Sequence, residues 1–288
     1  MGDEVPTETE SAFPAGHFYS PVVNPADVER RRHRIWPESP TVHGIDFGET
    51  SHRRVLTEIF PRFIGDYDYP DEAPAGDGET TGFFSGNSAF GWLDSRALFV
   101  LLRHWQPRRL IEVGGGYSSL LIADVNQRFL SGSLAITTIE PYPPTFLQRG
   151  LDGGELLEER VEDVPTKVFE RLESGDVLFI DSSHVAKTGS DVNFLIFEIL
   201  PRLAPGVKIH VHDIFLPHDY PASWVLEENR SWNEQYMVRA LLMYSRAFRV
   251  VFGCSYAAHR FPDLVAEALA DGRVLGGGSL WIERVDET

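Results

Sequence analysis

Residues Leu110 to Ser119 read LIEVGGGYSS, and this stretch decides the fold. Branched apolar residues form a short buried strand, three glycines follow, and a helical pattern begins at Ser118. Glycine permits unusual backbone angles and carries no side chain, so a ligand can approach the backbone closely. Loops at the carboxyl ends of strands are where open α/β sheets bind ligands. The stretch therefore predicts a strand, a ligand-binding turn and a helix.

Strand-like and helical segments alternate around this loop, which predicts right-handed βαβ units and a mostly parallel sheet. The last two strands lack a convincing crossover between them, so we expect an antiparallel pair at the sheet's edge. The strand-like segments are RLIEV (109–113), LAITTIE (134–140), the end of ELLEERV (155–161), DVLFIDS (176–182), GVKIHVHD (206–213), FRVVFGC (248–254) and SLWIERV (279–285). The helical segments are SRALFVLLRHW (95–105), SSLLIADVNQRF (118–129), PPTFLQRG (143–150), PTKVFERL (165–172), SDVNFLIFEILPRL (190–203), WNEQYMVRALLMYS (232–245) and DLVAEALA (263–270).

The first 85 residues differ from the rest, because Pro, Gly and acidic residues are frequent and periodicity is confined to pieces such as RRVLTEIFPRFI (53–64). We interpret residues 1–85 as a partly ordered N-terminal extension and residues 86–288 as one ligand-binding domain. Two interpretations of the extension stay open. It is either an oligomerisation arm or a cover over the site, or it is a mobile tail with some surface packing.

Composition narrows the class of protein. The 288 residues are 42% hydrophobic, and 43 acidic residues outnumber 26 Lys and Arg, giving a formal net charge of −17. That charge disfavours binding to nucleic acid or to an anionic membrane. A single cysteine, Cys254, is in keeping with a reducing cytoplasm. The start MGDEVPTETE has no signal-peptide core, and no apolar run is long enough to predict a membrane span.

The residues around the glycine loop indicate which ligand it holds. Ser119 replaces the third glycine of a dinucleotide fingerprint, and no Lys-Ser or Lys-Thr follows as in a phosphate-binding P-loop. Glu112 would repel a pyrophosphate but suits an ammonium or sulfonium group. Glu140, at the end of the next strand in TIEPYP, can accept both hydroxyls of a ribose.

Together these motifs resemble the class I S-adenosylmethionine-dependent methyltransferases, in particular their small-molecule O-methyltransferase branches. The resemblance covers residue 86 to the C-terminus, and it rests on IEVGGGYSS, IEPYP, VLFIDSSH, LPRLAPGVKIHVHD and GSLWIER. It implies a Rossmann-like α/β fold, with a seven-stranded, mostly parallel sheet and an antiparallel C-terminal strand. It also implies a binding set for S-adenosylmethionine. That set comprises Glu112, Gly114, Gly115, Gly116, Ser118 and Ser119 around the methionine part, Glu140 on the ribose, Glu162 or Asp163 near the adenine, and Asp181 near the sulfonium.

A second polar cluster follows the next two strands. IDSSH contains Asp181 and His184, and HVHD contains His212 and Asp213. Methyl transfer to a hydroxyl needs a group that removes its proton, and a histidine with a near-neutral pKa is a suitable general base. We assign this role to His184, with Asp181 as a second catalytic residue.

A divalent metal is an alternative or an aid, since it would lower the hydroxyl's pKa. In the catechol-type O-methyltransferases that the chain resembles, an Asp after strand four and an Asp-Asn pair after strand five bind Mg²⁺. Asp181 and Asp213 match two of these positions, but Ile214 stands where the Asn would be. His212 could complete a site, although such a mixture of ligands suits a transition metal better.

The sequence therefore predicts a cytoplasmic enzyme that transfers a methyl group to a hydroxyl of a small molecule, such as a sugar or natural product. It would form a homo-oligomer through the N-terminal region. An alternative is a non-methylating relative of the same fold, either a metal-dependent hydroxylase or an accessory cofactor-binding protein. An inactive nucleotide-binding module and a nicotinamide oxidoreductase are less favoured, the latter because of Glu112 and Ser119.

Overall fold

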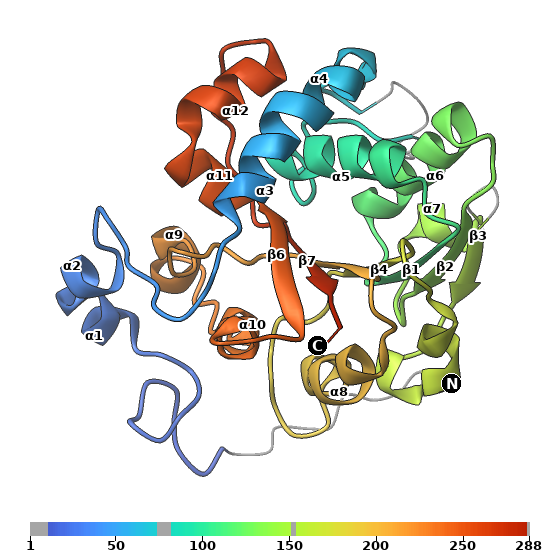
Figure 1. The fold of residues 1–288 in the computed structure, drawn as a ribbon. Coiled ribbons are helices and arrows are strands. Elements are labelled where there is room, and N and C mark those ends of the chain that lie inside the picture. The colour runs from blue at the N-terminus through green and yellow to red at the C-terminus, as the bar shows by residue number, and fades with distance from the viewer. Residues whose placement is uncertain (1–10, 74–81, 151–153, 287–288) are drawn as a thin grey trace.

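The computed structural model describes residues 11–73, 82–150 and 154–286, and a single sheet runs through its centre (Figure 1). The sheet has seven strands in the order β3-β2-β1-β4-β5-β7-β6. The strands are β1 (Arg109–Val113), β2 (Ala135–Ile139), β3 (Gly154–Leu157), β4 (Val177–Ile180), β5 (Lys208–Val211), β6 (Phe248–Gly253) and β7 (Leu280–Arg284). The predicted fold class is confirmed.

The order of the strands positions the site. From β1 the chain adds β2 and β3 on one side, then crosses to the other side for β4 and β5, and all five strands are parallel. The reversal between β1 and β4 leaves a crevice at their carboxyl ends, which is where ligands bind in open sheets. The C-terminal strand β7 runs antiparallel to both β5 and β6, as expected from the sequence.

Helices cover both faces of the sheet (Figure 1). Alternate strand residues face opposite layers, so Leu110 packs with α5 and α6 while Ile111 packs with the layer around η5. The helices are α1 (Pro25–Arg30), α2 (Arg32–Ile35), α3 (Glu49–Arg54), η1 (Val55–Ile59), α4 (Phe60–Phe63), η2 (Ile64–Asp66), α5 (Trp92–Trp105), α6 (Tyr117–Phe129), α7 (Thr145–Gln148), η3 (Val161–Asp163), η4 (Thr166–Arg171), α8 (Asp191–Phe194), η5 (Leu195–Ile199), η6 (Leu200–Arg202), α9 (Ala222–Leu226), α10 (Glu234–Leu242), α11 (Cys254–Arg260) and α12 (Pro262–Leu269). None of the helices in the described part of the chain has the length and apolarity that crossing a bilayer requires.

Two local predictions were wrong. The third strand occupies Gly154–Leu157, at the start of the ELLEERV segment instead of its end, because these residues pair with Ile136–Ile139 of β2. Helix α11 follows β6 directly and was not predicted. Its CSYAAHR sequence is too short to show a helical period, and contacts with β6 and α5 hold it in place.

Part of the N-terminal region belongs to the core. The helical run of α3, η1 and α4 buries Val55, Leu56, Ile59 and Phe60 in the same cluster as α5. Figure 1 shows this run lying across the α5 side of the sheet, whereas α1 and α2 sit apart, near α9. Within residues 1–85, the described part thus divides into a packed helical run and a peripheral segment.

Candidate functional site

The glycine loop sits where the ends of three strands meet. The Gly114 amide donates to the Ile139 carbonyl at 2.9 Å, and the Asp181 amide donates to the Val113 carbonyl at 2.8 Å. Gly114 has φ +88°, and a Cβ there would lie 1.7 Å from the Asp181 carbonyl oxygen. Only glycine permits this approach, so the tips of β2, β1 and β4 are held together at Gly114.

Glu140 lies against this loop, as the sequence predicts. One carboxylate oxygen accepts the Gly115 amide at 3.2 Å, and the other accepts the Tyr142 amide at 2.8 Å. The two bonds fix the carboxylate at the edge of a cavity while leaving lone pairs on both oxygens. A pair of vicinal hydroxyls could donate to them.

Glu112, predicted to contact the ligand, lies behind the loop among hydroxyl groups. Its side chain is fully buried, and its oxygens accept hydroxyl hydrogen bonds from Ser118 (2.7 Å), Ser119 (2.6 Å) and Thr138 (3.0 Å). Burial raises the pKa of Glu112 to about 7, even though these hydroxyls favour the charged form. The Glu112 carboxylate is therefore held in an internal hydrogen-bond network. Glu112, Ser118 and Ser119 support the loop from behind.

A cavity of about 410 Å³ opens beside Glu140, and we call it the Glu140 cavity. Of the two predicted adenine contacts, Glu162 lines it, whereas Asp163 is not among the described lining residues. Sequence reasoning missed Arg160 and Lys187, which also line the cavity. The cavity's further lining residues include Val113, Gly114, Ile139, Tyr142, Asp181, Ser190 and Asp191.

His184 joins the tips of β4 and β5. Its Nε2 lies 3.3 Å from Asp181 Oδ1 and 3.5 Å from Asp213 Oδ2, and its Nδ1 lies 2.9 Å from Glu234 Oε2. His184, Asp213 and Glu234 are buried and Asp181 is half-buried. Glu234 opens α10, fifty residues further along the chain, and was not predicted. Its signal, an acid in the first turn of a helix, is common to many helices that carry no site.

Asp181 and Glu234 set the pKa of the His184 imidazole. Burial alone would lower its pKa, but the hydrogen bonds to Asp181 and Glu234 outweigh burial and raise the pKa to about 10. The imidazole is therefore an imidazolium at neutral pH, whereas the sequence-based assignment assumed a near-neutral pKa. Burial raises the pKa of Asp213, the second carboxylate beside His184 Nε2.

The predicted metal ligands Asp181 and Asp213 lie beside the His184 imidazole, and the third, His212, lies beside Asp213. The His184 imidazole, rather than an open coordination position, lies between the two carboxylates. His212 Nε2 lies 3.6 Å from Asp213. Over the described ranges, no group of three or more His, Cys, Asp or Glu side chains is arranged to share an ion. Ile214, at the third family position, is buried in the core.

A second cavity, of about 720 Å³, lies on the other side of Asp181 and His184. We call it the tryptophan cavity, because Trp92, Trp224 and Trp232 line it. Asp213 and the glycines 276–278 form another part of its wall. Asp181 lines both this cavity and the Glu140 cavity, so the two meet at the tip of β4.

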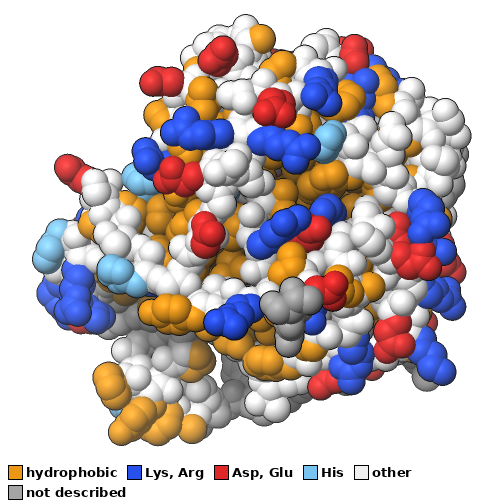
Figure 2. Space-filling view, in the orientation of Figure 1, with side chains coloured by type: hydrophobic (Ala, Val, Ile, Leu, Met, Phe, Trp, Pro, Cys, Tyr) orange, Lys and Arg blue, Asp and Glu red, His pale blue; other side chains and the backbone are white. Residues whose placement is uncertain are grey.

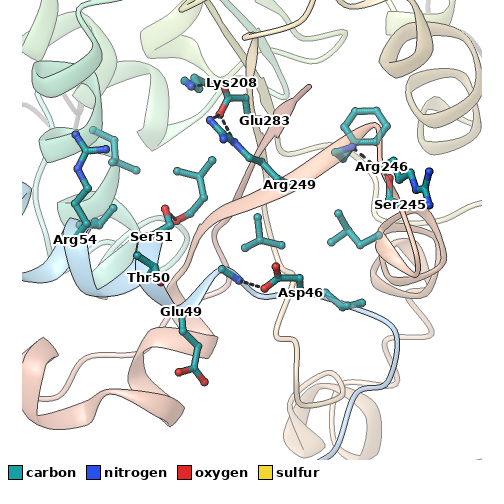
Figure 3. Close-up of a pocket in the computed structure, with 18 of the residues that line it drawn as sticks. Asp46, Glu49, Thr50, Ser51, Arg54, Lys208, Ser245, Arg246, Arg249 and Glu283 are labelled. Atoms are coloured by element: carbon teal, nitrogen blue, oxygen red, sulfur yellow. Dashed lines mark hydrogen bonds and ion pairs between the residues drawn. The ribbon is translucent and has the colours of Figure 1, made fainter. Parts of the chain in front are cut away.

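The largest of these cavities, about 1070 Å³, lies elsewhere, beside β6 and α3 (Figure 3). There Glu283 pairs with Lys208 at 2.8 Å and with Arg249 at 2.5 Å. Lys208 is the first residue of β5 and Glu283 pairs opposite it, so this cavity faces the amino ends of the parallel strands. It contains none of the strand-tip residues described above, and we therefore place the candidate site at the other two cavities.

A family model described as a methyltransferase domain matches residues 111–214. An uncharacterized protein of Archaeoglobus fulgidus is 37% identical over 177 residues, covering 60% of this chain and 79% of that protein. Two solved structures show a more distant likeness. One is a methyltransferase from Geobacter sulfurreducens, with 20% identity, a TM-score of 0.37, and coverage of 66% of this chain and 78% of the other. The other is Burkholderia thailandensis 1,6-didemethyltoxoflavin-N1-methyltransferase, with 14% identity, a TM-score of 0.39, and coverage of 86% and 95%.

Proposed function

Since this chain belongs to the class I S-adenosylmethionine-dependent methyltransferases, we propose that it methylates a hydroxyl group of a small molecule. The observation that carries the proposal is the meeting of two cavities at Asp181. One cavity has the polar groups for a nucleoside, and the other is bordered by a group that can take up a proton.

The residues around the Glu140 cavity fit S-adenosylmethionine. Glu140 would accept the ribose hydroxyls, and Glu162 and Arg160 would border the adenine. A Cβ at Gly116 would meet no atom within 4 Å, so this glycine leaves open space for the methionine part. The carboxylate of Asp181, at the junction of the cavities, would face the sulfonium.

When bound, S-adenosylmethionine supplies an electrophilic methyl group, whose transfer breaks the carbon–sulfur bond and forms a carbon–oxygen bond. The chain's own residues hold the acceptor oxygen in line and receive its proton. We assign proton uptake to the Asp213 carboxylate, whose pKa is raised by burial, while the His184 imidazolium holds Asp181 and Asp213 in place. This assignment favours a hydroxyl acceptor, which must lose a proton. No step is assigned to a metal.

Isothermal titration calorimetry of the whole chain with S-adenosylhomocysteine and with NAD tests the proposal. We expect binding of the first and none of the second. Glu140→Gln should weaken binding about tenfold, because a charge-assisted hydrogen bond contributes about 1.5 kcal/mol more than is retained by a neutral acceptor. Glu155→Gln is the matched control, since Glu155 is an exposed residue of β3.

The same samples separate the remaining outcomes. Absence of S-adenosylhomocysteine binding would refute the proposal. Binding with no methyl transfer to any acceptor would favour the accessory-protein alternative. Rates measured with and without EDTA should agree, because His184 already occupies the space between Asp181 and Asp213.

A further inference from the structure

We propose that the tryptophan cavity binds an uncharged sugar ring, and that a hydroxyl of this ring is the methyl acceptor. The inference rests on the proposed function and narrows its substrate class. It is carried by the aromatic walls of the cavity, by the angles between them, and by the pairing of Arg230 with Glu228.

Three of the six tryptophans in the chain line this one cavity. Trp92 is 53% exposed and has φ +43°, a backbone conformation that residues other than glycine rarely adopt. An exposed indole on a strained backbone adds nothing to the core, and such strain is typical of functional sites. Trp232 packs on the reactive group itself, with its ring centroid 4.4 Å from that of His184.

The aromatic walls form a corner and not a flat slot. Trp224 and Trp232 meet at 77°, with centroids 5.3 Å apart, and Phe215 meets Trp224 at 89°. A planar aromatic acceptor would be held best between parallel faces, which this cavity does not offer among its described residues. A puckered ring can place weakly positive C–H groups on one indole face while its hydroxyls point toward the polar wall.

The arginine of the cavity is already paired with a carboxylate. Arg230 is the one Lys or Arg among the described lining residues. It bonds Glu228 at 2.6 Å and lies 4.2 Å over Trp224 and 4.6 Å over Trp232. Asp94 accepts the amides of Gly278 and Ser279, at 3.1 and 2.7 Å. An anionic acceptor would thus find no unpaired Lys or Arg among the described lining residues.

These paired groups still offer hydrogen bonds without net charge. Arg230 donates Nε and one terminal nitrogen to Glu228, which leaves other N–H groups of the guanidinium for a ligand. The carboxylate oxygens of Asp213 and Glu228 can accept hydroxyl hydrogens. Donors, acceptors and apolar faces together match a polyhydroxylated ring, and the volume of about 720 Å³ is in the range of small-molecule sites.

Backbone hydrogen bonds connect the segment that carries Trp224 and Trp232 to His184. The amides of Asn233 and Glu234 both donate to the His184 carbonyl at 3.1 Å, and the Arg230 amide donates to the Trp224 carbonyl at 2.9 Å. A ring placed against Trp224 and Trp232 would therefore be held in register with His184. In the reaction, a hydroxyl oxygen of the sugar forms a bond to the methyl carbon as the carbon–sulfur bond of the cofactor breaks, and the hydroxyl proton passes to the Asp213 carboxylate beside His184.

A panel of acceptors tests the inference with the whole chain and radiolabelled S-adenosylmethionine. The panel contains uncharged methyl glycosides and disaccharides, and, as comparators, catechols, primary amines and sugar phosphates. We expect methyl transfer to one or more uncharged sugars. Trp224→Ala and Trp92→Ala should each raise the KM for the sugar about tenfold, because an aromatic contact is lost. Neither should change the Kd for S-adenosylhomocysteine. Trp105→Phe, in the cavity beside β6, is the control.

Each outcome bears on a different claim. Methylation of a catechol, amine or sugar phosphate, with none of an uncharged sugar, overturns the inference and leaves the proposed function intact. So does a chain that binds S-adenosylhomocysteine but neither binds nor methylates any sugar in the panel. Loss of S-adenosylhomocysteine binding itself would instead count against the proposed function.

Discussion

His184 has two features that each lower the stability of the folded protein unless its surroundings compensate for them. Its backbone has φ +60°, and its side chain is buried among three carboxylates. Asp213, which it contacts, also has a positive φ, at +57°. Each such conformation costs about 1–3 kcal/mol, so the surrounding structure must hold both residues in place. Both strained residues lie where, in our proposal, the proton of the acceptor hydroxyl is received.

Replacing His184 with glutamine should affect both rate and stability. We expect kcat to fall about 10²- to 10⁴-fold, because Asp213, which receives the proton, loses the imidazolium that holds it in place. The variant should also unfold more easily, by about 3–5 kcal/mol near pH 6, because Asp181 and Glu234 lose a buried counter-charge. Since the folded pKa is raised, this contribution is present below the ordinary value and disappears as the pH rises toward about 10. The stability gap should therefore narrow between pH 6.5 and pH 10 in urea unfolding followed by fluorescence.

His33→Gln provides the comparison, since His33 is an exposed residue of α2. It should match the parent protein at every pH. If the stability gap of the His184 variant stays constant or widens with rising pH, His184 is neutral in the folded protein, and the assignment of an imidazolium is wrong.

Residues at strand tips could be predicted from sequence, whereas their partners could not. Glu140, Asp181 and Asp213 each end a recognisable parallel strand, and such ends share one edge of a sheet. Glu112 was assigned to the ligand because a strand pattern does not show whether hydroxyls from the next helix will reach its carboxylate. Glu234 was missed because fifty residues and no motif separate it from His184.

At the scale of elements, Gly114 and Gly116 of the glycine loop have different structural roles. Gly114→Ala should destabilise the chain by several kcal/mol, because the new Cβ would meet the Asp181 carbonyl at 1.7 Å and φ is +88°. Gly116→Ala should fold almost normally, since nothing lies within 4 Å of its Cβ, and the backbone there is extended, with φ −164°. It should instead weaken S-adenosylhomocysteine binding by about tenfold or more, because the methyl group would occupy ligand space.

Urea unfolding and calorimetry on both variants check this division. Equal loss of stability in the two would contradict it, and so would unchanged affinity in a folded Gly116→Ala protein. From sequence, all three glycines had one explanation, that they make room for a ligand. The packing of β1 against β4 shows that Gly114 also makes room for the chain itself.

The fold was predictable where periodicity and length agreed. The buried strands β1, β4 and β5 are apolar runs between turn residues, and α5 and α6 have long helical periods. The position of β3 could not be predicted, because its half-exposed residues carry no alternating pattern. Its register depends on pairing with β2. Helix α11 depends likewise on contacts that a local pattern cannot show.

At the scale of the whole molecule, the peripheral N-terminal segment (residues 11–36) packs against residues 220–231, which carry part of the wall of the tryptophan cavity. Helix α1 packs on α9, the Trp36 indole N–H donates to the Tyr220 carbonyl at 2.7 Å, and the Val23 amide donates to Ser231 at 3.2 Å. The same segment exposes apolar side chains, with Phe18 91% and Tyr19 69% exposed. Figure 2 shows hydrophobic side chains gathered at the lower left, where this segment lies in Figure 1. We propose that it both covers the site and joins copies of the chain.

Removal of residues 1–36 should therefore separate acceptor binding from cofactor binding. The segment 220–231 loses its brace and carries Trp224 and Arg230, so the KM for the acceptor should rise about tenfold or more. The Kd for S-adenosylhomocysteine should stay unchanged, because the Glu140 cavity is lined by other parts of the chain. Trp36→Phe removes only the indole donor and should give a smaller rise. Light scattering after size exclusion should show a smaller assembly for the truncated chain. An unchanged KM would make the segment irrelevant to the site, and an unchanged number of chains per assembly would rule it out as an oligomerisation arm.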